Sequence, residues 1–256
     1  MSLLGAFVLA RRETFSGLAV AQLAAFGTVS GMIFGFHWGA AGLALVCAGV
    51  GMFMLHPLAR KSSVPPEVWV ACLYVLGAGL AVLLLAKAPH GEADAMGLFF
   101  GNVLSLGAAE VWESAGVLVL TLGAMGFWFH KWFWISFDSV SAGVAGLPVG
   151  RFNRLFLGLF GLAMTFSIHI LGVLLAFSYL VFPAAISFLL MRRVRGVFLL
   201  IPLVSIAATA AGYYFSFLWD LPTGPFIACL LAMALLAARL AKSKPATSRI
   251  KIPERV

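Results

Sequence analysis

Very few side chains within the apolar stretches of this sequence could bind a cation or carry a proton. His169 lies between two apolar segments, and Gln22 lies in the middle of another. Because an ionisable group is costly to bury in an apolar medium, such a residue is a functional candidate by default. His169 is therefore the candidate metal ligand, with a hydrogen bond to a neighbouring helix as the alternative. For Gln22 the structural role is favoured more, although it remains a candidate for a substrate path.

The spacing of the other polar residues favours neither an enzyme active site nor a tightly held metal. Helical metal sites place imidazole, thiolate or carboxylate groups three or four residues apart, and no HxxxH, CxxC, DxxxH or ExxH pair occurs. Glu110 and Glu113 have helical spacing but flank Trp112, where a solvated helix start is expected. No Gly-rich phosphate loop with a Lys is present, so we expect no ATP hydrolysis by this chain, no enzyme activity and no cofactor.

The composition indicates an integral membrane protein. Of the 256 residues, 62% are hydrophobic and 10% are charged, with a mean hydropathy of +1.06, whereas soluble domains are about a quarter charged. These values exclude a soluble globular domain and a disordered chain, and 3 cysteines are too few for a disulfide scaffold. The net charge of +8 resides at the ends of apolar stretches. It therefore indicates membrane topology, and no nucleic-acid partner is expected.

Apolar windows of about 20 residues, long enough to cross a bilayer as a helix, predict an all-α bundle of about eight spans. We expect spans at 15–36, 38–58, 66–86, 113–131, 153–170, 172–191, 197–218 and 225–241. The fifth and sixth form one continuous apolar stretch, which suits two short spans or one span followed by a broken helix, so seven spans are the alternative. In the first span Gly27, Gly31 and Gly35 recur every fourth residue, which predicts close packing against another helix.

The basic residues set the expected orientation. With Arg11 and Arg12 in the cytoplasm, eight crossings leave only Lys87 of the 17 Lys and Arg on the outer side. Residues 1–242 are then the transmembrane domain. Residues 243–256 are expected to form a cytoplasmic basic tail.

Two proline-containing segments mark expected turns of the chain. Residues 220–225 (DLPTGP) predict a rigid turn at the outer face, where Asp220 caps the turn or meets an incoming ligand. Pro183 should end or kink the sixth span. Because a basic cluster follows it, we expect a short surface helix offered to a cytoplasmic partner near Arg192, Arg193 and Arg195.

Several segments together carry a family resemblance. Residues 172–175 (GVLL) lead to residues 181–185 (VFPAA), and the DLPTGP turn follows. Weaker matches are Arg11 and Arg12 before Gly17, residues 100–102 (FGN), and residues 137–138 (FD) ahead of residues 146–148 (GLP). In this order and at these separations, they resemble the permease subunits of the zinc, manganese and iron uptake branch of ABC transporters, over nearly the whole chain from Leu3 onward.

The resemblance implies a multi-pass protein of the bacterial inner membrane that supplies a gated path and is not itself an enzyme. Its implied partners are a second permease in a homo- or heterodimer, two cytoplasmic ATPase subunits, an extracytoplasmic solute-binding protein and the lipid bilayer. The implied substrate is a divalent transition metal: zinc, manganese or iron. We expect the substrate path to include Gln22, Asn102, Glu110, His169 and Asp220. We expect the ATPase to dock at Pro183, Arg192, Arg193 and Arg195, with residues 138–150 as the alternative.

Two departures from the family pattern leave the substrate open. The first long span of that family opens with Gly-Asp-x-x-x-His, whose acid and imidazole lie one helical turn apart. Here Leu18 and Gln22 occupy those positions, and neither replaces a charged ligand. The chain also begins at the second half of the family's first span, which a longer start or a partner would complete. The alternatives are an importer of a metal chelate or non-metal solute, and a partner subunit for a permease with the intact metal site.

Overall fold

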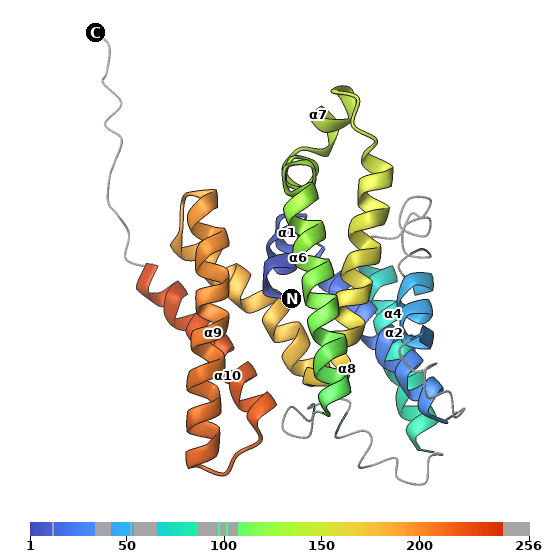
Figure 1. The fold of residues 1–256 in the computed structure, drawn as a ribbon, viewed down its shortest axis with the longest axis vertical. Helices are drawn as coiled ribbons and strands as arrows, with labels where there is room; N and C mark the ends of the chain where they lie inside the picture. The colour runs from blue at the N-terminus through green and yellow to red at the C-terminus, as the bar shows by residue number, and fades with distance from the viewer. Residues whose placement is uncertain are drawn as a thin grey trace.

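The computed structural model describes residues 1–11, 13–33, 42–51, 53, 66–86, 97, 101 and 107–242. This part of the chain is helical and contains no strand, as the all-α prediction requires. A shorter apolar helix occupies Gly42–Gly51. The labelled helices in Figure 1 are α1 (Ser2–Ala10), α2 (Thr14–Ile33), α4 (Pro66–Leu85), α6 (Ala108–Phe137), α7 (Ser139–Val144), α8 (Val149–Leu190), α9 (Val194–Leu218) and α10 (Thr223–Lys242).

Within the described residues, 6 helices are long and apolar enough to cross a membrane. Five of them, α2, α4, α6, α9 and α10, each coincide with one expected span. The helix at Gly42–Gly51 is the described part of the expected span 38–58. The sixth long helix, α8, covers the two expected spans between residues 153 and 191.

The break inside α8 decides how the chain crosses the membrane there. A straight helix of 42 residues would be about 63 Å long, roughly twice the apolar thickness of a bilayer. Gly172 interrupts it with φ 76° and ψ 165°, a conformation essentially restricted to glycine. In Figure 1 the first half of α8 runs from the α7 end of the molecule to the opposite end, and the second half returns toward α9. The two halves of α8 therefore run in different directions, which favours two short spans over a single crossing.

Of the two effects expected at Pro183, an end of the helix and a kink, the first does not occur. α8 continues through Pro183 to Leu190, and the residue with non-helical φ and ψ is Gly172. Proline fixes its own φ at a helical value, so it removes one backbone hydrogen bond without reversing the chain. The reversal needs a positive φ, which glycine supplies.

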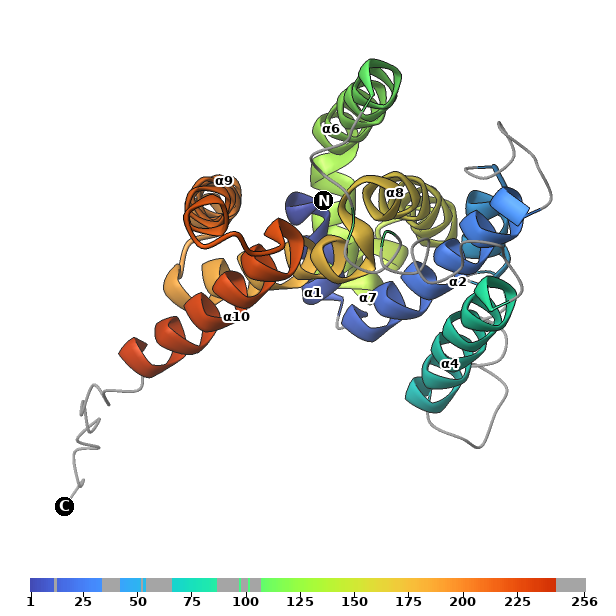
Figure 2. The same cartoon turned by 90° about the horizontal axis from the view of Figure 1, so that it is seen from below.

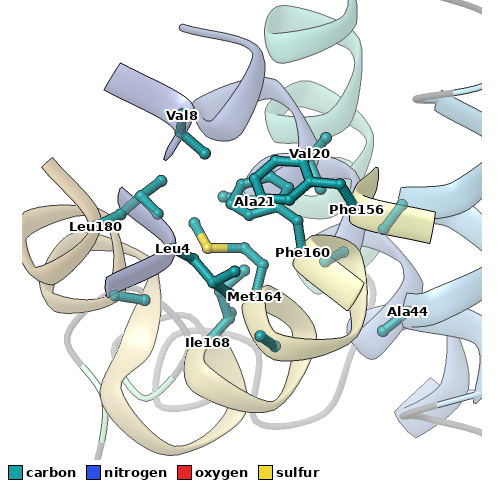
Figure 3. Close-up of a cluster of buried hydrophobic side chains, with 14 of the residues drawn as sticks. Leu4, Val8, Val20, Ala21, Ala44, Phe156, Phe160, Met164, Ile168 and Leu180 are labelled. Carbon is teal, nitrogen blue, oxygen red and sulfur yellow. The ribbon is translucent and has the colours of Figure 1, made fainter. Parts of the chain in front are cut away.

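The core forms where α1 packs against both halves of α8. Leu4, Phe7 and Val8 of α1 are buried, and Figure 3 shows Leu4 and Val8 beside Met164 and Leu180 of α8. A Cβ placed on Gly5 would lie 1.7 Å from the carbonyl oxygen of Leu180. The two backbones are therefore in direct contact, which fixes α1 at the centre of the bundle.

Glycines also bring α2 against its neighbours, as the sequence pattern predicts. A Cβ on Gly27 would lie 2.5 Å from the Cα of Ala44. On α4, a Cβ on Gly77 would lie 2.8 Å from the carbonyl carbon of Gln22 and 2.9 Å from the backbone nitrogen of Leu23. These helices pack backbone to backbone, and Figure 2 shows α2 and α4 side by side. The predicted close packing is confirmed at Gly27.

The two ends of the bundle differ in charge. The end with α7 and the α8–α9 connection lies opposite the α9–α10 turn (Figure 1). Glu113, near the start of α6, and Asp220 belong to the α9–α10 end. The basic residues of the described chain lie at or near the α7 end, and they are Arg11, Lys131, Arg151, Arg154, Arg192, Arg193, Arg195, Arg239 and Lys242.

Candidate functional site

Gln22 lies deep in the bundle, where α2 crosses α4. Its side chain is 4% exposed, and its backbone touches Gly77 as described above. Among the described residues, Oε1 of Gln22 has no hydrogen-bond partner. An unpaired buried acceptor costs about 1–3 kcal/mol, and amide oxygens are donors that hard divalent cations accept. Leu18, one helical turn earlier, is half-buried and adds no donor.

Two other predicted path residues, His169 and Asp220, have side chains that the structure describes, and neither belongs to a converging group of metal ligands within the described ranges. His169 is exposed on α8, one turn before the Gly172 break, and Asp220 is exposed in the α9–α10 turn. No group of three or more His, Cys, Asp or Glu residues converges within the described ranges. Asn102 lies outside those ranges, and Glu110 belongs to the first turn of α6, where its side chain is not described.

A backbone contact at the α9–α10 end joins two segments that the sequence singled out separately. Gly101 has a φ of 74°, and a Cβ on it would lie 2.3 Å from both the carbonyl carbon and the oxygen of Leu171. The backbone N–H of Gly101 donates to the carbonyl of Gly97 at 2.8 Å. Gly101 therefore packs onto the break in α8 beside Gly172, and a side chain at position 101 would prevent this contact.

The α9–α10 turn explains the role of Asp220. Its φ is 51°, and the N–H of Leu221 donates to the carbonyl of Ser216 at 3.0 Å. A left-handed residue with this hydrogen bond ends a helix in the way glycine commonly does, and Asp tolerates that conformation. Of the two roles predicted for Asp220, the geometry supports the turn.

A cavity of about 600 Å³ lies between residues 1–4, α6 and the first half of α8. Its polar atoms come mainly from hydroxyl groups, including those of Ser114, Thr121 and Ser167. Thr121 is 6% exposed, and its Oγ1 has no hydrogen-bond partner in the described part of the chain. The described lining residues include no carboxylate or imidazole, so the cavity offers weak dipoles and no charge to a bare cation. The sequence analysis missed this site because isolated Ser and Thr residues in apolar helices carry no pattern.

The short surface helix that the sequence placed after Pro183 lies elsewhere. Pro183 is buried, and α8 and α9 are joined directly by residues 191–193. The surface helix is α7, where Val140 and Val144 are 75% and 86% exposed. Asp138 caps α7 by accepting a hydrogen bond from the N–H of Ser141 at 3.0 Å. The N-cap Asp with a Gly-Leu-Pro segment after the helix was the sequence signal for this element.

Arg192, Arg193 and Arg195 are exposed at the same end of the bundle as α7. Lys242, at the end of α10, donates to the carbonyl of Leu189 near the end of α8. The α7 end of the bundle thus carries an apolar surface helix and, at the α8–α9 connection, a group of exposed positive charges. This combination suits a protein partner on that side.

Comparisons with known proteins agree with this architecture. The model of the ABC 3 transport family matches residues 1–242. The chain is 24% identical over 236 residues to the manganese transport system membrane protein MntC of Halalkalibacterium halodurans, covering 91% of this chain and 79% of that protein. It is 22% identical over 236 residues to the manganese import system permease protein ScaB of Streptococcus gordonii, covering 91% and 83%. The solved structure of PsaBC from Streptococcus pneumoniae in complex with Fab superposes with a TM-score of 0.84 at 20% identity, covering 93% of this chain and 84% of that chain.

Proposed function

The chain belongs to the ABC 3 transport family, and from this premise we propose that it is the permease subunit of an ABC importer for a divalent transition metal, driven by separate ATPase subunits. It is a multi-pass protein of the cell membrane. The observation that carries the proposal is the family match over residues 1–242, which covers every described helix. The chain supplies the path, and the partner subunits supply the free energy.

Among zinc, manganese and iron, manganese is our leading substrate. Relatives that align with most of the chain are named for manganese transport. Manganese accepts oxygen donors readily, and the unpaired Oε1 of Gln22 is a buried oxygen donor. Gln22 is therefore our first candidate for the path, with His169, Glu110, Asn102 and Asp220 as further candidates.

The ATPase subunits are proposed to dock at the α7 end. Val140 and Val144 give α7 an exposed apolar surface, and Arg192 and Arg193 are exposed positive charges at the same end of the bundle. The solute-binding protein then meets the opposite end, at the α9–α10 turn. Two double variants distinguish the parts of this docking surface: Arg192 and Arg193 replaced with Glu, and Val140 and Val144 replaced with Asp. The measurement for each is the amount of ATPase that is recovered with the purified permease.

A second function is favoured by Leu18 and Gln22. Because these positions carry no charged ligand, the chain would serve as a partner subunit in a heterodimer, with the second permease holding the metal. In the homodimeric alternative this chain alone, with its ATPase, suffices for uptake.

Uptake by a reconstituted complex tests both readings. Proteoliposomes containing this chain and its cognate ATPase are supplied with the cognate solute-binding protein, ATP and radioactive manganese. ATP-dependent accumulation supports the importer. Accumulation only after addition of a second permease supports the partner subunit. If neither assembly moves manganese, zinc or iron while ATP is hydrolysed, the metal substrate is wrong and a chelate or non-metal solute replaces it.

A further inference from the structure

Arg11 joins three helices at the base of α7. It ends α1, and its Nε donates to Oγ of Ser136 on α6 at 2.9 Å. Its Nη1 donates to Oδ1 of Asn153 on α8 at 3.1 Å. The guanidinium also stacks on the ring of Phe156, with Cζ 4.1 Å from the ring centroid. These four side chains, which we call the Arg11 bridge, hold the end of α6 and the start of α8 on either side of α7.

The bridge is specific to arginine. The guanidinium of Arg11 contacts two acceptors on two helices and an aromatic face at once. Such a set of contacts requires a planar group with several N–H donors. A lysine could reach one acceptor but could not bridge both and stack. Ser136 is 9% exposed, and within the described residues Nη2 of Arg11 is buried without a hydrogen-bond partner. The partly buried charge is stabilised by the two hydrogen bonds, by the ring of Phe156 and by the carboxylate of Glu13.

A second contact ties α6 to α8 independently of Arg11. The indole Nε1 of Trp132 donates to the carbonyl of Phe152 at 3.1 Å. The ring of Phe152 also lies under the ammonium group of Lys131, at 5.1 Å. These contacts hold α6 and α8, the two long helices of the α6–α7–α8 hairpin, together without the bridge. The bridge adds a polar connection between this hairpin and α1, beside the apolar contacts that the Phe7 ring of α1 makes with Phe129 of α6 and Phe156 of α8.

α1 carries that connection into the centre of the bundle. It is 9 residues long, about 14 Å at 1.5 Å per residue. Its Gly5 rests against the backbone of Leu180 in the second half of α8, beyond the Gly172 break. Its first residues line the cavity of about 600 Å³. A displacement of α7 that moves the hairpin therefore moves α1, and α1 bears directly on the second half of α8.

Resting on the proposed function, we propose that Arg11 is a positioning residue that couples the ATPase-facing helix α7 to α1 and thereby to the second half of α8. Without the bridge, α7 would still form and would still meet a partner. Its movement would reach α1 only through the apolar contacts of Phe7 and its neighbours. ATP hydrolysis would then move less substrate per ATP.

The first test uses the full chain alone, in lipid nanodiscs. Spin labels are attached at Val144 of α7 and Leu199 of α9, both exposed, after replacement of Cys47, Cys72 and Cys229. With Arg11 present we expect one narrow distance distribution between the labels. Arg11→Met should broaden or shift it, because the hairpin is then held to the bundle by fewer contacts. An unchanged distribution in folded Arg11→Met overturns the proposal.

Arg154→Met is the matched control. Arg154 lies one residue from Asn153, but its Nε donates only to the carbonyl of Gly150 on the same helix, at 3.3 Å. Its removal should leave the label distances unchanged. If Arg154→Met changed the label distances as much as Arg11→Met, the effect would come from the loss of any arginine at this end and not from the Arg11 bridge. That result would also overturn the proposal.

The second test measures manganese transported per ATP hydrolysed in the reconstituted complex. Because hydrogen bonds to charged groups are the strong ones, we expect Arg11→Met to lower this ratio about tenfold. Arg11→Lys should be intermediate, and Arg154→Met should match the wild type. A folded Arg11→Met complex with the wild-type ratio contradicts the coupling role.

A double-mutant cycle separates coupling from general destabilisation. Asn153→Ala added to Arg11→Lys should lower the transport ratio less than Asn153→Ala alone, because both act on one contact. Additive losses would contradict a shared bridge. If Arg11→Met fails to fold, the cycle of Arg11→Lys and Asn153→Ala serves as the test instead. Should the wild-type complex transport none of manganese, zinc and iron, the proposed function fails, while the label distances still decide whether Arg11 holds α7.

Discussion

At the scale of single residues, the buried polar atoms without partners are the clearest departures from ordinary packing. In the described part of the chain they include Oε1 of Gln22 and the hydroxyl groups of Thr121 and Thr165. Buried polar groups are nearly always hydrogen-bonded, so each unpaired one needs a reason. Gln22 differs from the two threonines because its oxygen is a stronger acceptor, and because the family resemblance of the sequence implies that it occupies a metal-receiving position. This makes position 22 the residue at which the substrate question can be decided.

Restoring an acid and an imidazole should convert this position into a metal site. We expect the unmodified chain to bind manganese or zinc weakly, since one amide oxygen leaves the ion poorly compensated in an apolar path. Leu18→Asp with Gln22→His should strengthen binding at least about tenfold, because residues four apart share one helical face. Isothermal titration of the purified chain measures both affinities.

A pair with the same spacing on α4 is the control for this change. Val75→Asp with Gly79→His places the acid and the imidazole on exposed positions. If this pair binds metal as tightly as the pair on α2, the gain comes from chelation alone and the α2 position is not special. Tight zinc binding by the unmodified chain, lost in His169→Ala, would instead relocate the site to α8.

At the scale of elements, the fold depends on helices that touch through glycine. α4 meets α2 at Gly77, and α1 meets α8 at Gly5. Elsewhere on α4, Gly79 has no atom within 4 Å of an added Cβ. α4 thus contains one glycine that close packing requires, Gly77, and a second that it does not require, Gly79.

Gly77→Val should destabilise the chain, and Gly79→Val should not. The added side chain at position 77 overlaps the backbone of Gln22, which cannot move as a flexible side chain would. Overpacking of this kind costs about 1–3 kcal/mol. Thermal unfolding in detergent should show a lower midpoint for Gly77→Val only. Equal midpoints for the two variants would mean that α2 and α4 are not in close contact.

The N-cap of α7 should make that helix sensitive to acid. Hydrogen bonds from Ser141, its side chain first and then its N–H, hold the pKa of Asp138 below its ordinary value of 3.8. A carboxyl group whose pKa falls on folding stabilises the folded form above its unfolded pKa. That contribution is lost as the pH falls through the lower, folded value.

Amide protection in α7 measures this effect. After correction for the intrinsic pH dependence of exchange, protection of residues 141–144 should decrease below about pH 4, near the ordinary Asp value. Asp138→Asn should remove this step, because the amide caps at all pH values. A variant that retains the acid step would assign it to another group.

At the scale of the whole molecule, charge separates the two ends of the bundle. The basic residues of the described chain gather at the α7 end, and Asp220 and Glu113 belong to the other. Positive residues are retained on the cytoplasmic side of membrane proteins. The α7 end should therefore face the cytoplasm, where an ATPase can reach it.

Labelling of introduced cysteines tests this orientation. In a background without Cys47, Cys72 and Cys229, a membrane-impermeant reagent added to intact cells should label Leu221→Cys and should not label Val144→Cys. Both positions are exposed in the structure, so access is set by the membrane and not by packing. Labelling of position 144 from outside would reverse the orientation and remove the proposed ATPase surface.

The sequence by itself determined the class of fold, because crossing a bilayer requires long apolar helices whose lengths and charged ends can be read directly. It also determined the crossing positions to within a few residues, and the close packing at Gly27. The position of the break inside α8 needed the tertiary structure, since no Lys, Arg, Asp or Glu occurs between Arg154 and Arg192 to mark it. Gly172 and Pro183 are both plausible breaks in sequence, and only the backbone conformation distinguishes them.

Only the tertiary structure decided which residues meet. Gln22 and Gly77, Gly101 and Leu171, and Arg11 and Asn153 are far apart along the chain, and apolar helices all present similar patterns to one another. A membrane helix is apolar on every side, so its periodicity does not reveal which face touches a neighbour. The sequence could not identify the surface helix for the same reason. α7 is exposed because the end of α6 and the start of α8 are held together beneath it, and this contact is visible only in the tertiary structure.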